Sequence, residues 1–96
     1  MEIRWTEEAA NWLEDIFRYI AEDNPEAARR TVTAIYDKAL SLSKFPKIGS
    51  LHRTIREGEI RVILHEHYRI AYLLTIDGPI QVLGIFHGAL DIDRYL

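Results

Sequence analysis

Apolar and polar residues alternate with a period of two from Ile60 to His87. This is the spacing of β-strands, whose successive side chains point to opposite faces of a sheet. Turn residues at 77–79 interrupt the run, so the pattern predicts two or three strands joined by tight turns. Polar side chains occupy several strand positions and are the first candidates for function: Arg61, His65, His67, Arg69, Gln81 and His87.

Both faces of these strands are partly apolar. In the last strand the two predicted sets are Ile80, Val82, Gly84 and Phe86 on one side and Gln81, Leu83, Ile85 and His87 on the other. We expect one set to pack on helices supplied by the upstream chain. The other set needs a cover, and a partner chain, a substrate or the segment 89–96 would each provide one.

A helical period governs the chain upstream, after a short strand predicted over 2–5. Thr6 is suited to cap a helix that we expect to continue to about Glu22. Apolar residues at helical spacing predict a buried stripe on this helix: Ala9, Leu13, Ile16, Phe17 and Ile20.

Asn24 and Pro25 favour a new helix start, because asparagine caps helices and proline needs no N–H at the first position. This second helix is predicted to end near Ser43, before Pro46. Its apolar stripe is Ala28, Val32, Ile35, Ala39 and Leu42. Two helices joined by so short a link are expected to pack antiparallel as a hairpin.

Residues 47–58 are predicted to be mostly irregular, with a short strand over 53–56. The element order is therefore β-α-α-β-β-β. This is an α+β fold in which an antiparallel sheet carries an N-terminal helical hairpin on one face. A length of 96 residues fits a single domain, 1–96.

Composition excludes several classes of protein. The chain is 48% hydrophobic and 28% charged, which is typical of a globular domain and not of a disordered one. It has no cysteine, so it forms neither a disulfide nor a thiolate metal site. No apolar run reaches the roughly 18 residues of a membrane span, and the first residues lack a signal-peptide pattern. We expect a cytoplasmic protein without membrane contact.

The net charge of -3 argues against a general nucleic-acid binder. The charges are unevenly placed, since acids outnumber Lys and Arg nine to four over residues 1–37. Residues 38–56 then contain five Lys or Arg and no acid. This basic stretch is either a solvated loop face or a rim that binds phosphate or an acidic partner.

A series of short matches carries a family resemblance. The matching features are Trp5-Thr6, Leu13–Ile20 ending in Tyr19-Ile20-Ala21, Asn24-Pro25 with Ala27-Ala28, Phe45-Pro46 to Gly49, Arg61, Tyr68-Arg69-Ile70-Ala71-Tyr72, and His87-Gly88 with Asp91. On this series the chain resembles the RelE/ParE toxin family of bacterial type II toxin-antitoxin systems, and within it the ParE-like plasmid stabilisation branch. The matches cover nearly the whole chain in the right order.

The resemblance implies a small toxin that is neutralised by an antitoxin encoded beside it, of the ParD or RelB kind, in a hetero-oligomer. ParE-like members poison DNA gyrase, whereas RelE-like members enter the ribosomal A site and cleave mRNA. We expect gyrase inhibition without enzymatic activity and without a cofactor. The alternatives are a ribosome-dependent mRNA endonuclease and an antitoxin-binding module that has lost its toxicity.

Two positions depart from the family pattern. Ser50 and Leu90 stand where the family commonly has arginine. In RelE-like nucleases an arginine near the second of these places helps to stabilise the transition state, so Leu90 weakens the nuclease hypothesis.

If the chain were a nuclease, the resemblance would assign phosphate binding to Arg69, with Arg61 as a second cation and His87 as the general acid. An imidazole suits proton transfer because its pKa lies close to neutrality. In the alternative interpretation, Arg69 pairs with a carboxylate or anchors the sheet, and His87 is a hydrogen-bonded histidine at a strand end.

His65 and His67 would lie on one face of a single strand, with His87 on a neighbouring strand. Three imidazoles could ligate zinc. Glu66 would point to the opposite face, however, and no cysteine is present, so we expect no metal site.

Partner contacts are expected at Trp12, Arg69, Leu90 and Tyr95. We expect the antitoxin to lay an extended or helical C-terminal segment across the helical hairpin and an exposed sheet edge. The first helix carries the acids Glu7, Glu8, Glu14 and Asp15. This charge predicts basic residues in the antitoxin segment.

Overall fold

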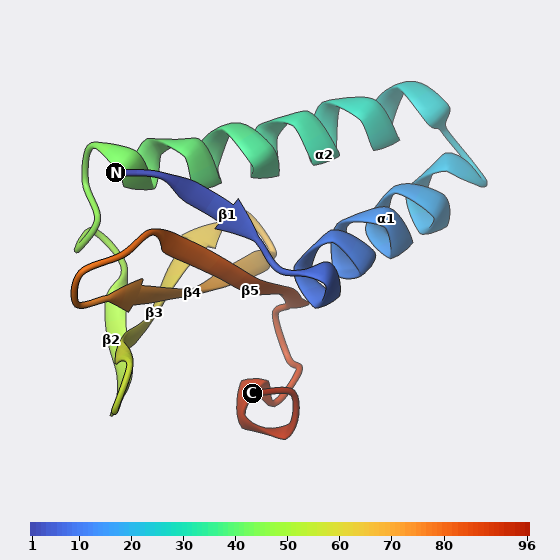
Figure 1. The fold of residues 1–96 in the computed structure, drawn as a ribbon. Helices are drawn as coiled ribbons and strands as arrows, with labels where there is room; N and C mark the ends of the chain where they lie inside the picture. Colours follow the sequence, from blue (N-terminus) through green and yellow to red (C-terminus); the bar gives the residue numbers. More distant parts are fainter.

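The computed structural model describes residues 1–96 and contains two α-helices and five strands (Figure 1). The elements in chain order are β1 (Ile3–Trp5), α1 (Glu7–Ala21), α2 (Pro25–Leu40), the 3₁₀ helix η1 (Ser41–Ser43), β2 (Ser50–Ile55), β3 (Gly58–His65), β4 (Tyr68–Thr75), β5 (Ile80–His87) and the 3₁₀ helix η2 (Ile92–Arg94). The hairpin of α1 and α2 lies over one side of the sheet, and its closed end projects past the strands (Figure 1).

The sheet has the strand order β1-β5-β4-β3-β2. Strands β2 to β5 pair antiparallel in sequence, while β1 pairs parallel with β5. The predicted α+β architecture with a helical hairpin on one face is confirmed. The sheet is mixed and not purely antiparallel as predicted, because the last strand, β5, lies beside β1 and runs in the same direction. The segment expected to be mostly irregular supplies the edge strand β2, which is longer than the strand predicted over 53–56.

Side-chain caps begin both helices, as predicted. The Thr6 hydroxyl accepts a hydrogen bond from the Ala9 N–H at 3.1 Å. The Asn24 side-chain carbonyl accepts one from the Ala27 N–H, also at 3.1 Å. Each cap satisfies an amide that has no partner within its helix. The Thr6 hydroxyl also donates to the Val82 carbonyl at 3.1 Å, so this cap fastens α1 to β5.

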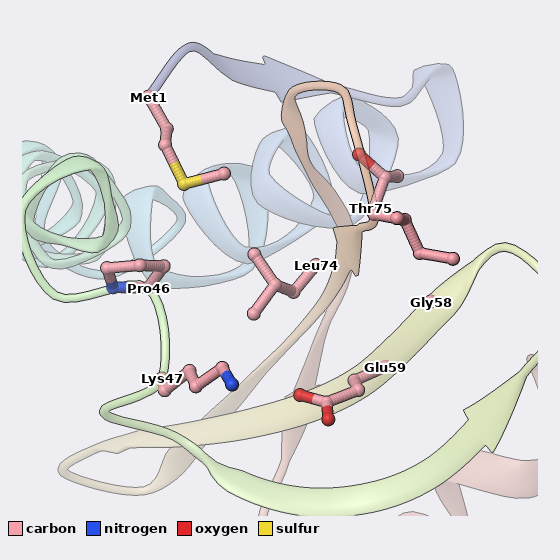
Figure 2. Close-up of a pocket in the computed structure, with 8 residues that line it drawn as sticks. Met1, Pro46, Lys47, Gly58, Glu59, Leu74 and Thr75 are labelled. Atoms are coloured by element: carbon pink, nitrogen blue, oxygen red, sulfur yellow. The ribbon is translucent and has the colours of Figure 1, made fainter.

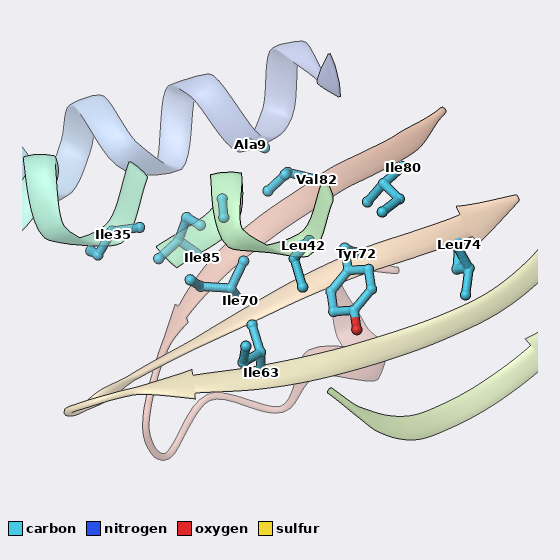
Figure 3. Packing of buried hydrophobic residues seen from close by; sticks show 11 residues of the cluster. Ala9, Ile35, Leu42, Ile63, Ile70, Tyr72, Leu74, Ile80, Val82 and Ile85 are labelled. Carbon is cyan, nitrogen blue, oxygen red and sulfur yellow. The ribbon is translucent and has the colours of Figure 1, made fainter. Parts of the chain in front are cut away.

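The main core lies between the hairpin and the sheet (Figure 3). Its buried members are Ala9, Ile35, Ala39, Leu42, Ile63, Ile70, Tyr72, Leu74, Ile80, Val82 and Ile85. They come from both helices, from η1 and from β3, β4 and β5. Burying each large aliphatic side chain of this kind contributes about 1.5–3 kcal/mol.

The stripe predicted to be buried on α1 is mostly half-buried, and this part of the prediction is wrong. Only Ala9 is buried fully, whereas Leu13, Ile16, Phe17 and Ile20 remain partly exposed. The reason is geometric, because the closed end of the hairpin extends beyond the strands and the second half of α1 has little sheet beneath it (Figure 1). The helix therefore presents apolar side chains that the chain itself does not cover.

A β-bulge shifts the side-chain phase of β5. Ala71 pairs with Gly84 and Tyr72 pairs with Val82, so Leu83 is left without a partner in β4. As a result Val82 and Ile85 share the main core, although the strict alternation predicted opposite faces for them. Phe86 moves to the other face. A side chain at Gly84 would meet its ring, since a Cβ there would lie 2.4 Å from Phe86 Cζ.

The segment after β5 covers the second face of the sheet, which confirms one of the three covers considered from the sequence. Ala71, Phe86 and Ile92 form a small buried cluster there. Partly buried residues pack around it: Trp12, Val62, Leu90 and Leu96. The hairpin thus covers one side of the sheet and the chain end covers part of the other, where Leu64 of β3 remains 65% exposed.

Candidate functional site

Arg61 holds the loop that precedes β2. Its guanidinium donates to the Gly49 carbonyl at 2.7 Å and to the Lys47 carbonyl at 3.3 Å. Its Nε also forms an ion pair with Glu59 at 2.9 Å, and only 14% of the side chain is exposed. Because the guanidinium already contacts two loop carbonyls and a carboxylate, Arg61 acts as a structural anchor for this loop.

Arg69 lies on the face that the chain end covers. It donates to the backbone carbonyl of Leu90 and has no carboxylate partner. Its Nε is buried without a hydrogen-bond acceptor. The structure therefore agrees with the anchoring role considered for Arg69, and a carbonyl takes the place of the expected carboxylate.

The three histidines near the sheet end do not form the arrangement predicted for them. A tight turn at residues 66–67 separates β3 from β4, and Glu66 there has a φ of 53°. His65 is the last residue of β3 and His67 lies in the turn, so the prediction of one shared strand face is wrong. The ring centroids of His67 and His87 are 6.2 Å apart. No group of three His, Cys, Asp or Glu side chains is placed to hold a metal ion.

The candidate nuclease residues do not converge on one site. Arg61 pairs across strands with Tyr72 and His87 with Tyr68, so both lie on the hairpin side of the sheet. Their partners are four residues apart along β4, which corresponds to about 13 Å. Arg69 pairs with Phe86 and therefore lies on the opposite side.

The four predicted partner-contact residues do lie near one another. The Trp12 ring meets Phe86 edge-on at 5.0 Å and Tyr95 at 5.2 Å. Leu90 packs against the same cluster, and its carbonyl binds Arg69. In this structure the four residues attach the chain end to α1 and the sheet.

A further ion pair holds the chain end against the edge strand. Asp93 in η2 accepts from His52 in β2 at 2.8 Å and lies 3.7 Å from Arg53. The hydrogen bond from His52 and the two nearby charges lower the pKa of Asp93. Part of the basic stretch over 38–56 therefore forms contacts within the chain, since His52 and Arg53 both lie against Asp93.

An apolar hollow, which we call the hairpin groove, is lined by residues of α1 and α2 and by Trp5 of β1. Its lining residues are Trp5, Ala10, Leu13, Glu14, Phe17, Val32 and Tyr36, around a volume of about 420 Å³. Trp5 and Tyr36 stack with their centroids 5.8 Å apart, and Trp5 Nε1 is buried without an acceptor. None of the predicted partner-contact residues lines this groove, although Trp5 and the apolar stripe of α1 in the sequence point to it.

A second hollow, which we call the wedge, opens between the projecting half of α1 and the end of the sheet. Its lining residues are Trp12, Asp15, Ile16, Tyr19, Ile20, Tyr68 and His87, around about 370 Å³. The ring of His87 stands edge-on to Tyr68 at 5.6 Å. Burial, followed by the charge of Glu66 and by Tyr19, raises the pKa of Tyr68. Trp12 was the one predicted partner residue found here.

A third hollow of about 350 Å³ lies where β3 begins and β4 ends (Figure 2). Leu74 stands inside it, with Met1 and Pro46 on one side and Glu59 on the other (Figure 2). Lys47 and Glu59 supply one charge of each sign to its lining. None of the predicted site residues lines this hollow.

Comparison with known proteins places the chain in a family. The family described as ParE toxin of type II toxin-antitoxin system, parDE, matches residues 3–92. The chain belongs to the ParE toxin family. The curated protein "Putative toxin Y4kP" of Sinorhizobium fredii (strain NBRC 101917 / NGR234) is 33% identical over 86 residues, which are 90% of this chain and 86% of that protein.

A solved structure supports the same fold. The chain resembles a protein of the chromosomal ParDE TA system from P. aeruginosa with a TM-score of 0.73 and 23% identity. The likeness covers 91% of this chain and 95% of the other. The resemblance read from the sequence is therefore confirmed, and the chain is a ParE-type toxin of a type II toxin-antitoxin system. None of its helices has the length and apolar character needed to cross a membrane.

Proposed function

We propose that this ParE-type toxin inhibits DNA gyrase by protein–protein contact and that a ParD-like antitoxin neutralises it by covering the helical hairpin. Gyrase poisoning is the activity that the family resemblance implies. The observation that carries the mechanism is the separation of Arg61 and His87 from Arg69 by the sheet itself. Without a converging set of acid, base and cation, binding is the function that this geometry supports. Action on gyrase places the toxin in the cytoplasm.

The hairpin groove is the proposed antitoxin site. It exposes Leu13, Phe17 and Val32 along two helices, in the pattern that receives an amphipathic helix. Contiguous apolar surface of this kind marks interaction sites on otherwise polar proteins. Each apolar side chain that the partner buries contributes about 1.5–3 kcal/mol before the entropy of association is subtracted.

The outer edge of β1 extends this site. The Glu2 carbonyl and the Thr6 N–H both point towards β5. Backbone groups alternate in direction along a strand, so the groups of Ile3 and Trp5 point to the open edge. An antitoxin segment leaving the groove beside Trp5 would find hydrogen-bonding groups there for a further strand.

Two assays test the proposal. Purified toxin added to purified gyrase is expected to inhibit supercoiling and to increase cleaved DNA, and the same toxin should leave mRNA intact on purified ribosomes. Unchanged gyrase activity together with mRNA cleavage would overturn the assignment of the target.

The antitoxin site is tested separately with Ala10→Arg, since Ala10 is exposed and lines the groove. The change should weaken binding of the antitoxin encoded beside the toxin gene by at least about tenfold, because it places bulk and charge in an apolar contact. Thr33→Arg is the matched control, because Thr33 is exposed on α2 and does not line the groove. Equal affinities for the two variants would exclude the groove.

A further inference from the structure

The wedge on the other side of α1 has a volume of about 370 Å³, close to the 420 Å³ of the hairpin groove, but differs from the groove in chemistry. Two aromatic side chains face its opening, Tyr19 from α1 and Tyr68 from β4. Tyr19 is 78% exposed, although it is large and lies beside Ile16 and Ile20. Single exposed apolar residues are normal, whereas a contiguous set drawn from a helix and two strands indicates a surface that a partner covers.

Unpaired acidic side chains lie in the wedge and beside it. Asp15 lines it and also lines a neighbouring hollow with Glu8, Asn11 and Trp12. Neither Asp15 nor Glu8 takes part in an ion pair; on α1 that interaction is made by Glu14 with Arg18. Lysine and arginine are absent from the lining of both hollows. The turn residue Glu66 adds a charge close enough to raise the pKa of Tyr68.

The aromatic lining and the unpaired acids of the wedge favour a ligand that is both apolar and basic. A bulky apolar side chain would fill the space between Tyr19 and Tyr68. A lysine or arginine beside it would meet the unpaired Asp15 and the Trp12 ring, which attracts cations through its π face. An acidic segment would be repelled, because it would bring like charges together in a partly desolvated site.

We propose that the wedge binds a basic and apolar segment of the antitoxin, and that Asp15 selects the basic residue. This inference rests on the proposed antitoxin partner and extends its site beyond the hairpin groove. The two hollows flank the same helix, with Leu13 and Phe17 on one side and Ile16 and Ile20 on the other. A helix is about 10 Å across, so roughly four extended residues carry a chain from one side to the other.

Charge variants of the toxin test the inference. Asp15→Lys is expected to weaken binding of the neighbouring-gene antitoxin by at least about tenfold, and Asp15→Asn by less, because reversal adds repulsion to the lost attraction. Asp23→Lys is the matched control, since Asp23 is exposed between the helices and lines neither hollow. Affinities are measured by titration calorimetry, and circular dichroism shows that each variant is folded.

A compensating change provides the second arm of the test. If Asp15 contacts a basic residue, one Lys→Glu or Arg→Glu change in the antitoxin should restore binding to the Asp15→Lys toxin. Asp15→Lys and Asp23→Lys having the same affinity would overturn the wedge proposal. Because Ala10→Arg reports on the groove alone, a loss with that variant and none with Asp15→Lys would leave the proposed function standing. No loss with either variant would overturn both the wedge and the hairpin groove as antitoxin sites.

Discussion

Replacing Tyr72 with phenylalanine removes a single oxygen atom that joins the core to the loop before β2. The Tyr72 hydroxyl donates to the Pro46 carbonyl at 2.8 Å and accepts from the Gly49 N–H at 3.0 Å. The ring itself is fully buried in the main core, where phenylalanine has the same shape (Figure 3). The variant therefore tests the two hydrogen bonds and leaves the packing intact.

The expected cost follows from the two contacts. A lost hydrogen bond costs about 0.5–1.5 kcal/mol, and a buried amide left without an acceptor costs about 1–3 kcal/mol. Gly49 is buried, so its N–H has no direct route to water. We expect Tyr72→Phe to lower the free energy of unfolding by about 2–3 kcal/mol. For a domain of this size the melting temperature should fall by roughly 10 °C or more.

The same variant changes the response to alkali. Burial raises the pKa of Tyr72, although the Gly49 hydrogen bond and the Arg61 charge act in the other direction. Above the ordinary tyrosine pKa of about 10, the unfolded chain therefore releases a proton that the folded chain retains. Stability falls as pH rises through this range, and Tyr72→Phe should make the fall shallower. Tyr68, whose pKa is also raised, keeps part of the dependence.

Urea unfolding followed by circular dichroism at pH 7.5 and between pH 9.5 and pH 11 measures both effects. Tyr19→Phe is the control at pH 7.5, because the Tyr19 side chain is 78% exposed. A loss of stability at pH 7.5 no larger than that of the control would show that these two hydrogen bonds do not stabilise the fold. An alkaline dependence identical to that of the unsubstituted chain would contradict the raised pKa of Tyr72.

Three further variants probe other contacts. Thr6→Ala should lower the free energy of unfolding in urea by about 1 kcal/mol or more, because it removes the cap of α1 and its link to β5; an unchanged value would exclude that role. Gly49→Ala should destabilise the fold and broaden the NMR signals of its loop, since a Cβ there would lie 2.8 Å from the Tyr72 hydroxyl oxygen; unaltered spectra would argue against the close approach. The lowered pKa of Asp93 stabilises the fold above the ordinary aspartate value, and this contribution is lost as pH falls through the lowered value. Urea unfolding should therefore show a difference between Asp93→Asn and the unsubstituted chain at pH 7 that shrinks below pH 4.

Local chemistry explains the parts of the fold that could be predicted from sequence. Thr6, Asn24 and Pro25 act through contacts within three residues along the chain, so their identity is enough to place the helix starts. The alternation after Ile60 likewise reports a strand directly, because it reflects burial on one face. Strand β2 gives no such signal, since almost all of its residues are exposed and its pairing with β3 decides its conformation.

The candidate site could be predicted less well, because it depends on interactions between distant residues. The turn at 66–67 contains neither glycine nor asparagine, so nothing in its composition separates His65 from His67. The bulge at Leu83 exchanges the faces of the residues after it, and a strict period of two cannot show this. The wedge exists because the closed end of the hairpin projects past the strands, and this offset depends on how the helices pack on the sheet (Figure 1).

We propose DNA gyrase as the target of this ParE-type toxin. The most direct test is induced expression in a bacterium without the antitoxin, with pulse labelling of DNA and protein during the first minutes. We expect DNA synthesis to fall first while protein synthesis continues. Arg69→Ala and His87→Ala should then reduce toxicity only as far as they lower the amount of folded toxin. Protein synthesis falling first, with toxicity abolished by His87→Ala in a stably folded chain, would contradict gyrase as the target.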